Sequence, residues 1–164
     1  MHTIHIIDSL QLSPSGPAAG NELVHLRQGD ADGACGPYCV LMALIACGIA
    51  PRAQATGGGV TDARTCMGRV WAKLSRWGPL VCEGTDDDAI NDLFGAYRAM
   101  VITHHPHNER PSTVRRFILK HLAANQPVVV GIDVEDGCPH WVLAIGFEDR
   151  GSSVFRSKVN GHFG

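Results

Sequence analysis

Cys35 stands at the start of an apolar stretch, GACGPYCVLMALIACG, and this position gives its thiol a possible chemical use. Residues 36–46 carry no charge and are apolar on every side, which is typical of a helix buried at the centre of a domain. Pro37 suits the first turn of such a helix, and Gly48 suits its end. A thiol at a helix N-terminus lies in the positive end of the helix dipole, which favours the thiolate. The thiolate is the nucleophilic form of cysteine.

Other roles for the cysteines compete with this interpretation. A redox pair needs two cysteines separated by two residues, whereas three residues separate Cys35 from Cys39. A buried structural thiol is the ordinary role of an unpaired cysteine. We expect that role for the remaining cysteines, which are Cys39, Cys47, Cys66, Cys82 and Cys138. The nucleophile interpretation of Cys35 requires three further groups: a base, an oxyanion donor and a residue that orients the base.

The chain offers a candidate for each group. His140 is the candidate base, because it stands in GCPHWVLAIGFED at the start of an apolar strand and directly after a turn. An imidazole in that position can face a cysteine from another element and form a thiolate–imidazolium pair. Gln28 precedes Cys35 in a loop, and its amide can donate to an oxyanion together with the Cys35 backbone N–H. Asn160 and Asp149 are both candidates for orienting the imidazole.

The order of these residues resembles that of the papain-like cysteine peptidases. A glutamine is followed by a loop, by Cys-Gly-Pro opening a long apolar helix, and later by a histidine heading the strand HWVLAIG. The similarity is greatest to the bacterial double-glycine leader peptidases of bacteriocin exporters, and it covers segments 28–48 and 127–160. The resemblance implies that Gln28 is the oxyanion glutamine, Cys35 the nucleophile and His140 the base.

The third catalytic residue departs from the pattern of that bacterial branch. The branch has an Asp-Pro after the strand that follows the histidine, whereas this chain has VFRSKVNGHFG there. Papain itself has an asparagine in a loosely similar place, so the resemblance implies Asn160. The alternatives are that Asp149 orients the imidazole or that no residue does so. The missing Asp-Pro also favours a rival hypothesis, in which the chain is an inactive relative that serves as a protein-binding module.

The elements that must position these residues fall into helices first and strands last. Besides residues 36–46, we expect helices from a cap at Thr61 or Asp62 to about Trp77, within 84–100, and at 113–125 after a Ser112 cap. We expect strands at 3–12, 101–103, 127–134, 140–149 and 152–159, and loops at SPSGPAAGN and PRAQATGGGV. This order predicts one α+β domain over residues 1–164. The resemblance implies that the domain has the papain-like cysteine peptidase fold, in which N-terminal helices include a central buried helix packed on a C-terminal antiparallel sheet.

The composition of the chain limits the classes of binding partner and the cellular compartment that we expect. The chain has 164 residues and a net charge of −2, so bulk charge attracts neither nucleic acid nor an anionic membrane. The N-terminal segment lacks the features of a secretory signal, which predicts a cytoplasmic protein with reduced thiols; export by a route without such a signal is the alternative. The histidines of THHPHNER have no cysteine or carboxylate cluster at zinc-finger spacing, so we expect a solvated loop rather than a metal site.

The predicted function is hydrolysis of a peptide or isopeptide bond in a protein or peptide substrate, without cofactor or metal. The thiolate of Cys35 attacks a carbonyl, and water releases the resulting thioester. Attack by an amine instead of water makes the protein a transferase, and attack on a glutamine side chain makes it a deamidase. The sequence leaves these reactions open as alternatives.

Overall fold

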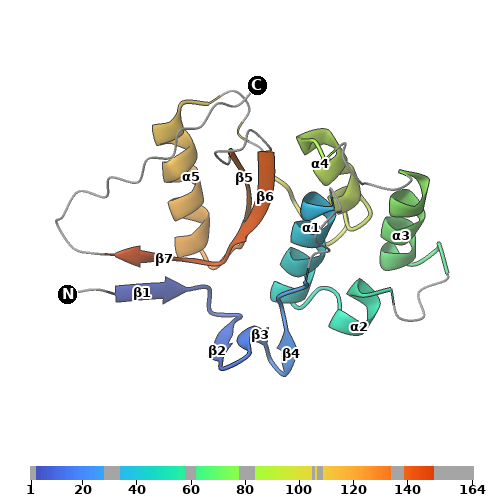
Figure 1. Cartoon of the computed structure of the whole chain (residues 1–164), viewed down its shortest axis with the longest axis horizontal. Helices are drawn as coiled ribbons and strands as arrows, with labels where there is room; N and C mark the ends of the chain where they lie inside the picture. Colours follow the sequence, from blue (N-terminus) through green and yellow to red (C-terminus); the bar gives the residue numbers. More distant parts are fainter. Residues whose placement is uncertain are drawn as a thin grey trace.

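The computed structural model describes residues 3–27, 34–57, 62–77, 84–104, 106, 109–133 and 139–149, whose elements form a mixed α+β fold (Figure 1). The helices are α1 (Cys35–Ala46), α2 (Arg52–Ala55), α3 (Cys66–Arg76), α4 (Asp87–Gly95) and α5 (Pro111–Ala123). The strands are β1 (Thr3–Ile6), β2 (Gln11–Ser13), β3 (Gly16–Ala19), β4 (Glu22–Leu23), β5 (Val128–Asp133), β6 (Pro139–Ala144) and β7 (Gly146–Asp149). The α+β class is confirmed, but four strands precede the first helix, so the predicted order of helices before strands is wrong.

Helix α1 is the centre of the fold, because almost every side chain in it is apolar. Eleven of its twelve residues are buried, which confirms the prediction of a helix without a polar face. Pro37 lies in the first turn, where its missing N–H removes no helical hydrogen bond. Beyond the end of the helix, Gly48 has φ +65°, a left-handed conformation that glycine adopts without strain.

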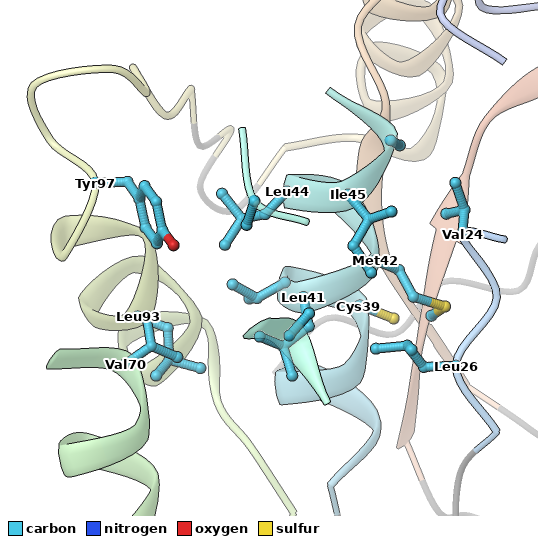
Figure 2. Packing of buried hydrophobic residues seen from close by; sticks show 14 of the residues in the cluster. Val24, Leu26, Cys39, Leu41, Met42, Leu44, Ile45, Val70, Leu93 and Tyr97 are labelled. Atoms are coloured by element: carbon cyan, nitrogen blue, oxygen red, sulfur yellow. The ribbon is translucent and has the colours of Figure 1, made fainter. Parts of the chain in front are cut away.

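The side chains of α1 divide between two sets of neighbours (Figure 2). One side of the helix points toward α3 and α4, and the opposite side points toward the segment that follows β4. On the first side Leu41 and Leu44 lie toward Val70, Leu93 and Tyr97, and on the second side Cys39 and Met42 lie toward Val24 and Leu26. Because all these residues are buried, their packing fixes the rotation of α1 about its own axis.

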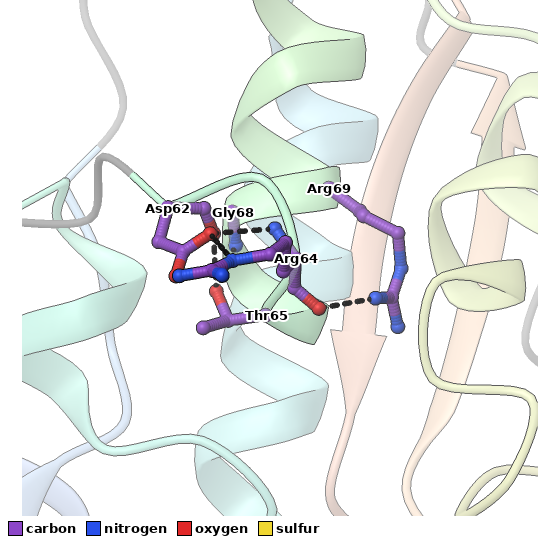
Figure 3. A network of polar contacts seen from close by, with 5 residues as sticks. All are labelled: Asp62, Arg64, Thr65, Gly68 and Arg69. Atoms are coloured by element: carbon purple, nitrogen blue, oxygen red, sulfur yellow. Dashed lines mark hydrogen bonds and ion pairs between the residues drawn. The ribbon is translucent and has the colours of Figure 1, made fainter.

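Helix α3 begins at a hydrogen-bonded cap (Figure 3). The Thr65 hydroxyl accepts from the Gly68 N–H at 2.9 Å and donates to the Asp62 carbonyl at 2.8 Å. The Asp62 carboxylate forms an ion pair with Arg64, whose hydrogen bonds lower the pKa of that carboxyl. The predicted cap at Thr61 or Asp62 is therefore wrong, because Thr65 takes this role and starts the helix later.

The other two long helices begin in different ways. Asp86 caps α4 by accepting the Ala89 N–H at 2.7 Å, and two further aspartates follow in the first turn, as the acidic segment predicted. Helix α5 starts at Pro111, with Arg110 at the N-cap position and no side-chain cap. Ser112 therefore lies inside the helix and is not its cap, because the fixed φ of proline already suits the first helical position.

Strands β5 and β6 form an antiparallel hairpin that carries the candidate base. Gly131 of β5 lies opposite Trp141 of β6, and a Cβ on Gly131 would lie 3.3 Å from the indole. Glycine therefore leaves room for the ring on this face of the hairpin. The predicted strand at 140–149 is divided at Ile145, after which β7 pairs with β1 instead of β5.

The strand predicted at 3–12 is present as two shorter strands, β1 and β2, whereas β3 and α2 lie where the sequence predicted loops. Strands β2, β3 and β4 form a three-stranded antiparallel sheet, because Gly16 and Gly20 adopt positive φ at its turns. Arg52 of α2 donates through Nη1 to the Leu23 and His25 carbonyls at 2.6 and 2.8 Å, which ties α2 to β4 and the residues after it. The strand predicted at residues 101–103 is not formed.

The hairpin of β5 and β6 lies between α5 and α1 in Figure 1, and both helices contact it. The predicted packing of the central helix on an antiparallel sheet near the C-terminus is thus present. The strand predicted at residues 152–159 lies outside the described residues. In the part of the chain that the structure describes, no helix combines the length and the apolar character that crossing a membrane requires.

Candidate functional site

Cys35 is the first residue of α1, at an end of the helix that no described side chain caps. The N-cap residue is Ala34, whose methyl group cannot accept a hydrogen bond. Unpaired N–H groups at a helix start form the positive end of the helix dipole and stabilise an adjacent anion. Cys35 is 7% exposed and lies outside the hydrophobic core cluster, which contains Cys39 one turn later.

The thiols further along α1 are less able to ionise. Burial, followed by the neighbouring Cys35, raises the pKa of Cys39 to about 12. Cys47 follows the helix and lines a cavity, and desolvation there raises the pKa of its thiol. At Cys39 the raised pKa agrees with the buried, inert role that we expected. At Cys47 the prediction of a buried thiol is wrong, because the residue is exposed beyond the end of α1, although its raised pKa still disfavours the thiolate. Two of the other predicted structural thiols, Cys82 and Cys138, lie outside the described residues.

Cys66 has a cationic neighbour that the sequence analysis missed. Its Sγ accepts a hydrogen bond from Arg69 Nη2 at 3.2 Å. The same guanidinium donates to the Ala96 carbonyl at 2.9 Å and to the Arg64 carbonyl at 2.7 Å, so its position is fixed. The three-residue spacing of Cys66 and Arg69 on one helix is the signal that indicates this contact. Cys66 is therefore the thiol against which the reactivity of Cys35 must be compared.

Helix α1 contacts β6, the strand that carries His140. Cys39 and Met42 line a cavity of about 350 Å³ together with His140. Cys35 precedes Cys39 by four residues, so the two side chains lie on the same face of the helix, one turn apart. Helical periodicity therefore places Cys35 on the side of α1 that borders this cavity, although Cys35 is not one of its lining residues.

Thr85 connects the start of α1 to the start of β6. The Trp141 indole N–H donates to the Thr85 carbonyl at 2.5 Å. On the other side, a Cβ built on Gly36 would lie 2.7 Å from the Thr85 Cβ, so α1 comes this close only because residue 36 is glycine. Gly36 follows Cys35 and Trp141 follows His140 in the chain. Through Thr85, the backbones of the candidate nucleophile and the candidate base are held in one region.

His140 lies in β6 opposite Ile132 of β5, and it is half-buried. It lines the smaller cavity and also a larger one of about 1040 Å³, which is bordered by α1, α4, α5 and β5. Within the described residues no hydrogen bond joins His140 to Cys35 or to any other side chain. The structure brings the two elements together without joining the two side chains. Catalytic hydrogen bonds are often long in the absence of substrate.

The remaining predicted site residues have different outcomes. Gln28 and Asn160 lie outside the described residues. Asp149 is the last residue of β7, where it pairs with Thr3, whereas His140 is near the start of β6. Each strand residue advances the chain by about 3.3 Å, so the two successive strands carry Asp149 away from His140. The structure therefore argues against Asp149 as the orienting group, and Asn160 remains a prediction.

The histidine-rich segment shows no metal site in its described part. His104 is exposed, and its ring centroid lies 5.4 Å from that of His121 on α5. His105 and His107 lie outside the described residues. Across the described ranges, no group of three or more histidine, cysteine, aspartate or glutamate residues is placed to hold a metal ion.

Comparisons of the chain with protein-family models, with curated proteins and with solved structures found no match. The similarity to papain-like peptidases therefore depends on the Gln-Cys-His motifs of the sequence itself. Any function must be inferred from the residues of the site and from their positions.

Proposed function

We propose that the protein is a papain-like cysteine hydrolase that cleaves a peptide or isopeptide bond. The observation that carries the proposal is the position of Cys35. It starts α1, where no described side chain caps the helix, and it lies one turn before Cys39, which lines a cavity together with His140. Thr85 supports this arrangement, because it contacts the residue after Cys35 and the residue after His140.

In the proposed reaction, His140 removes the Cys35 proton and the thiolate attacks the substrate carbonyl carbon. The backbone N–H of Cys35 and the amide of Gln28 donate to the oxyanion. The tetrahedral intermediate collapses to a thioester when the C–N bond breaks, and the imidazolium protonates the leaving amine. His140 then activates water, which hydrolyses the thioester and regenerates the thiol. Asn160 orients His140 in this scheme.

A second candidate function is an inactive papain-like domain that binds a protein. It is favoured by the sequence after the histidine strand, VFRSKVNGHFG, which lacks the Asp-Pro of the bacterial leader peptidases. Under this alternative the cavities beside His140 bind a peptide but do not cleave it. Transfer to an amine and deamidation of glutamine remain chemical variants of the first proposal.

Alkylation of the native protein tests the nucleophile. Iodoacetamide at neutral pH should modify Cys35 before every other thiol, and Cys39 last, because Cys39 is fully buried. Mass spectrometry of the digested protein measures the order. The Cys66→Ala variant is the control, since Cys66 is the thiol with a guanidinium neighbour, and it should leave the rate at Cys35 unchanged.

Hydrolysis of a peptide panel tests the reaction itself. Wild type should cleave at least one peptide, and the Cys35→Ala and His140→Asn variants should lose that activity. Equal rates for wild type and Cys35→Ala would overturn the hydrolase and support the binding module. Preferential alkylation of a cysteine other than Cys35 would exclude it as the activated thiol.

A further inference from the structure

The larger cavity has an apolar wall of a size that suits a ligand. Its volume is about 1040 Å³, near the upper end of typical small-molecule and peptide pockets. Aliphatic and aromatic side chains from α4, α5, β5 and the segment after α4 form much of the wall, among them Phe94, Val101, Ile102, Phe117, Ile118 and Val130. Such a wall favours a ligand with several apolar groups.

The charged side chains of this wall all have the same sign. Asp86, Asp87 and Glu109 line the cavity, and no lysine or arginine does so among its described lining residues. Asp86 and Glu109 are exposed, so their carboxylates lie at the solvent side of the cavity. At neutral pH these groups make the mouth anionic, which attracts cations and disfavours anions.

Exposed apolar side chains continue the cavity wall to the surface. Ile102 is 84% exposed and Met100 is 58% exposed, and both line the cavity. Large apolar groups left in water beside a pocket become stabilising when a partner covers them. The rim therefore combines apolar contact with negative charge, as an amphipathic and cationic ligand requires.

The cavity also reaches the proposed catalytic base. His140 and Trp141 are part of its lining, so a chain bound along the wall passes beside the imidazole. The cavity thus combines an apolar wall, an anionic mouth and a lining that includes His140, and these three features together define the kind of peptide that it would bind.

We propose that this cavity binds the peptide substrate through a segment that carries apolar side chains next to lysine or arginine. The inference rests on the proposed function, because that function makes the ligand a peptide. The apolar side chains occupy the wall, and the cationic side chains lie beside Asp86 and Glu109. Acidic peptides of the same length and hydrophobicity are excluded by charge.

Binding to the Cys35→Ala variant tests the inference without cleavage. The probes are a fluorescein-labelled peptide of leucine, lysine and glycine, and its analogue with glutamate in place of lysine. Fluorescence anisotropy should show tighter binding of the lysine peptide, and added salt should weaken that binding. Equal affinities for the two peptides would overturn the proposal.

Charge variants locate the site. Asp86→Asn keeps a capping side chain on α4, and Glu109→Gln is nearly isosteric. In the Cys35→Ala background, the two changes together should raise the Kd of the lysine peptide about threefold to tenfold, the size expected for two exposed ion pairs. Asp88→Asn is the matched control, because Asp88 lies in the same first turn but does not line the cavity. An equal loss in Asp88→Asn would mean that general surface charge causes the binding.

Two variants that each replace an exposed isoleucine with serine test the apolar wall of the cavity. Ile102→Ser should raise the Kd, whereas Ile4→Ser, which removes a 70% exposed isoleucine from β1, should not. Equal effects would contradict the assignment of this surface as the binding site.

The outcomes of the binding and cleavage experiments also distinguish this inference from the proposed hydrolase activity. Cleavage without preference for cationic peptides contradicts only this inference, and charge-selective binding without cleavage contradicts only the hydrolase.

Discussion

Replacing Gly36 with alanine should push the start of α1 away from Thr85. The new Cβ would lie 2.7 Å from the Thr85 Cβ and 2.9 Å from its Cγ2. Neither atom is the far end of a flexible chain, so the backbone must move. Such overpacking costs roughly 1–3 kcal/mol, and the gain from replacing a helical glycine offsets roughly 0.5–1 kcal/mol of it. We expect a net loss of about 1 kcal/mol, or a fall in Tm of roughly 2–4 °C.

Urea unfolding followed by tryptophan fluorescence measures the free energy. Gly95→Ala is the control, since a Cβ at Gly95 on α4 has no atom within 4 Å and should leave stability unchanged or slightly raised. In the double variant Gly36→Ala/Thr85→Gly the clash is removed. The loss should then be smaller than the sum of the two single losses by about 1 kcal/mol or more.

The same variant should change the chemistry at the neighbouring residue. Because Gly36 directly follows Cys35, a shift of α1 moves the thiol relative to His140. The alkylation rate of Cys35 should therefore fall in Gly36→Ala and recover in the double variant. Additive stabilities, or a Gly36→Ala variant as stable as Gly95→Ala, would refute the close packing of α1 against Thr85.

Three further expectations follow from particular contacts. Trp141→Phe removes the N–H that binds the Thr85 carbonyl and should cost about 1–3 kcal/mol in urea unfolding; an unchanged midpoint would show that this bond adds no stability. Thr65→Ala should cost about 1 kcal/mol by removing the α3 cap, whereas Thr65→Ser should retain it. The Cys39 thiol titrates near 9.0 when unfolded and near 12 when folded, so between these pH values the unfolded state binds fewer protons and stability falls as pH rises. Cys39→Ala should flatten this decline, and an equally steep decline would assign it to other groups.

The buried helix was predictable because its signal is local. An uncharged run with proline in its first turn and glycine after its end leaves few alternatives for residues 35–46. The acidic start of α4 and the β-rich composition of 128–149 are local signals of the same kind. Cap positions were harder to assign, because several nearby side chains could take the role, and Thr65 was selected by backbone geometry.

The packing around the site was not predictable in this way. Nothing in the residue types of Gly36, Thr85 and Trp141 links them, because they are far apart in the chain and meet only when α1 packs on β6. The N-terminal sheet was missed for a similar reason, since its short strands are stabilised by partners rather than by propensity. Asp149 lies away from His140 because β7 pairs with β1 and not with β5, and the sequence does not show this choice of partner.

That pairing of β1 with β7 also constrains how the protein is made. Thr3 lies opposite Asp149, so the first described strand has no partner until nearly all of the described chain has left the ribosome. At ordinary rates of translation this wait lasts on the order of ten seconds. The nascent β1 strand must remain without this partner for that time, with Ile4 available to chaperones, and the sheet can close only after β7 has been synthesised.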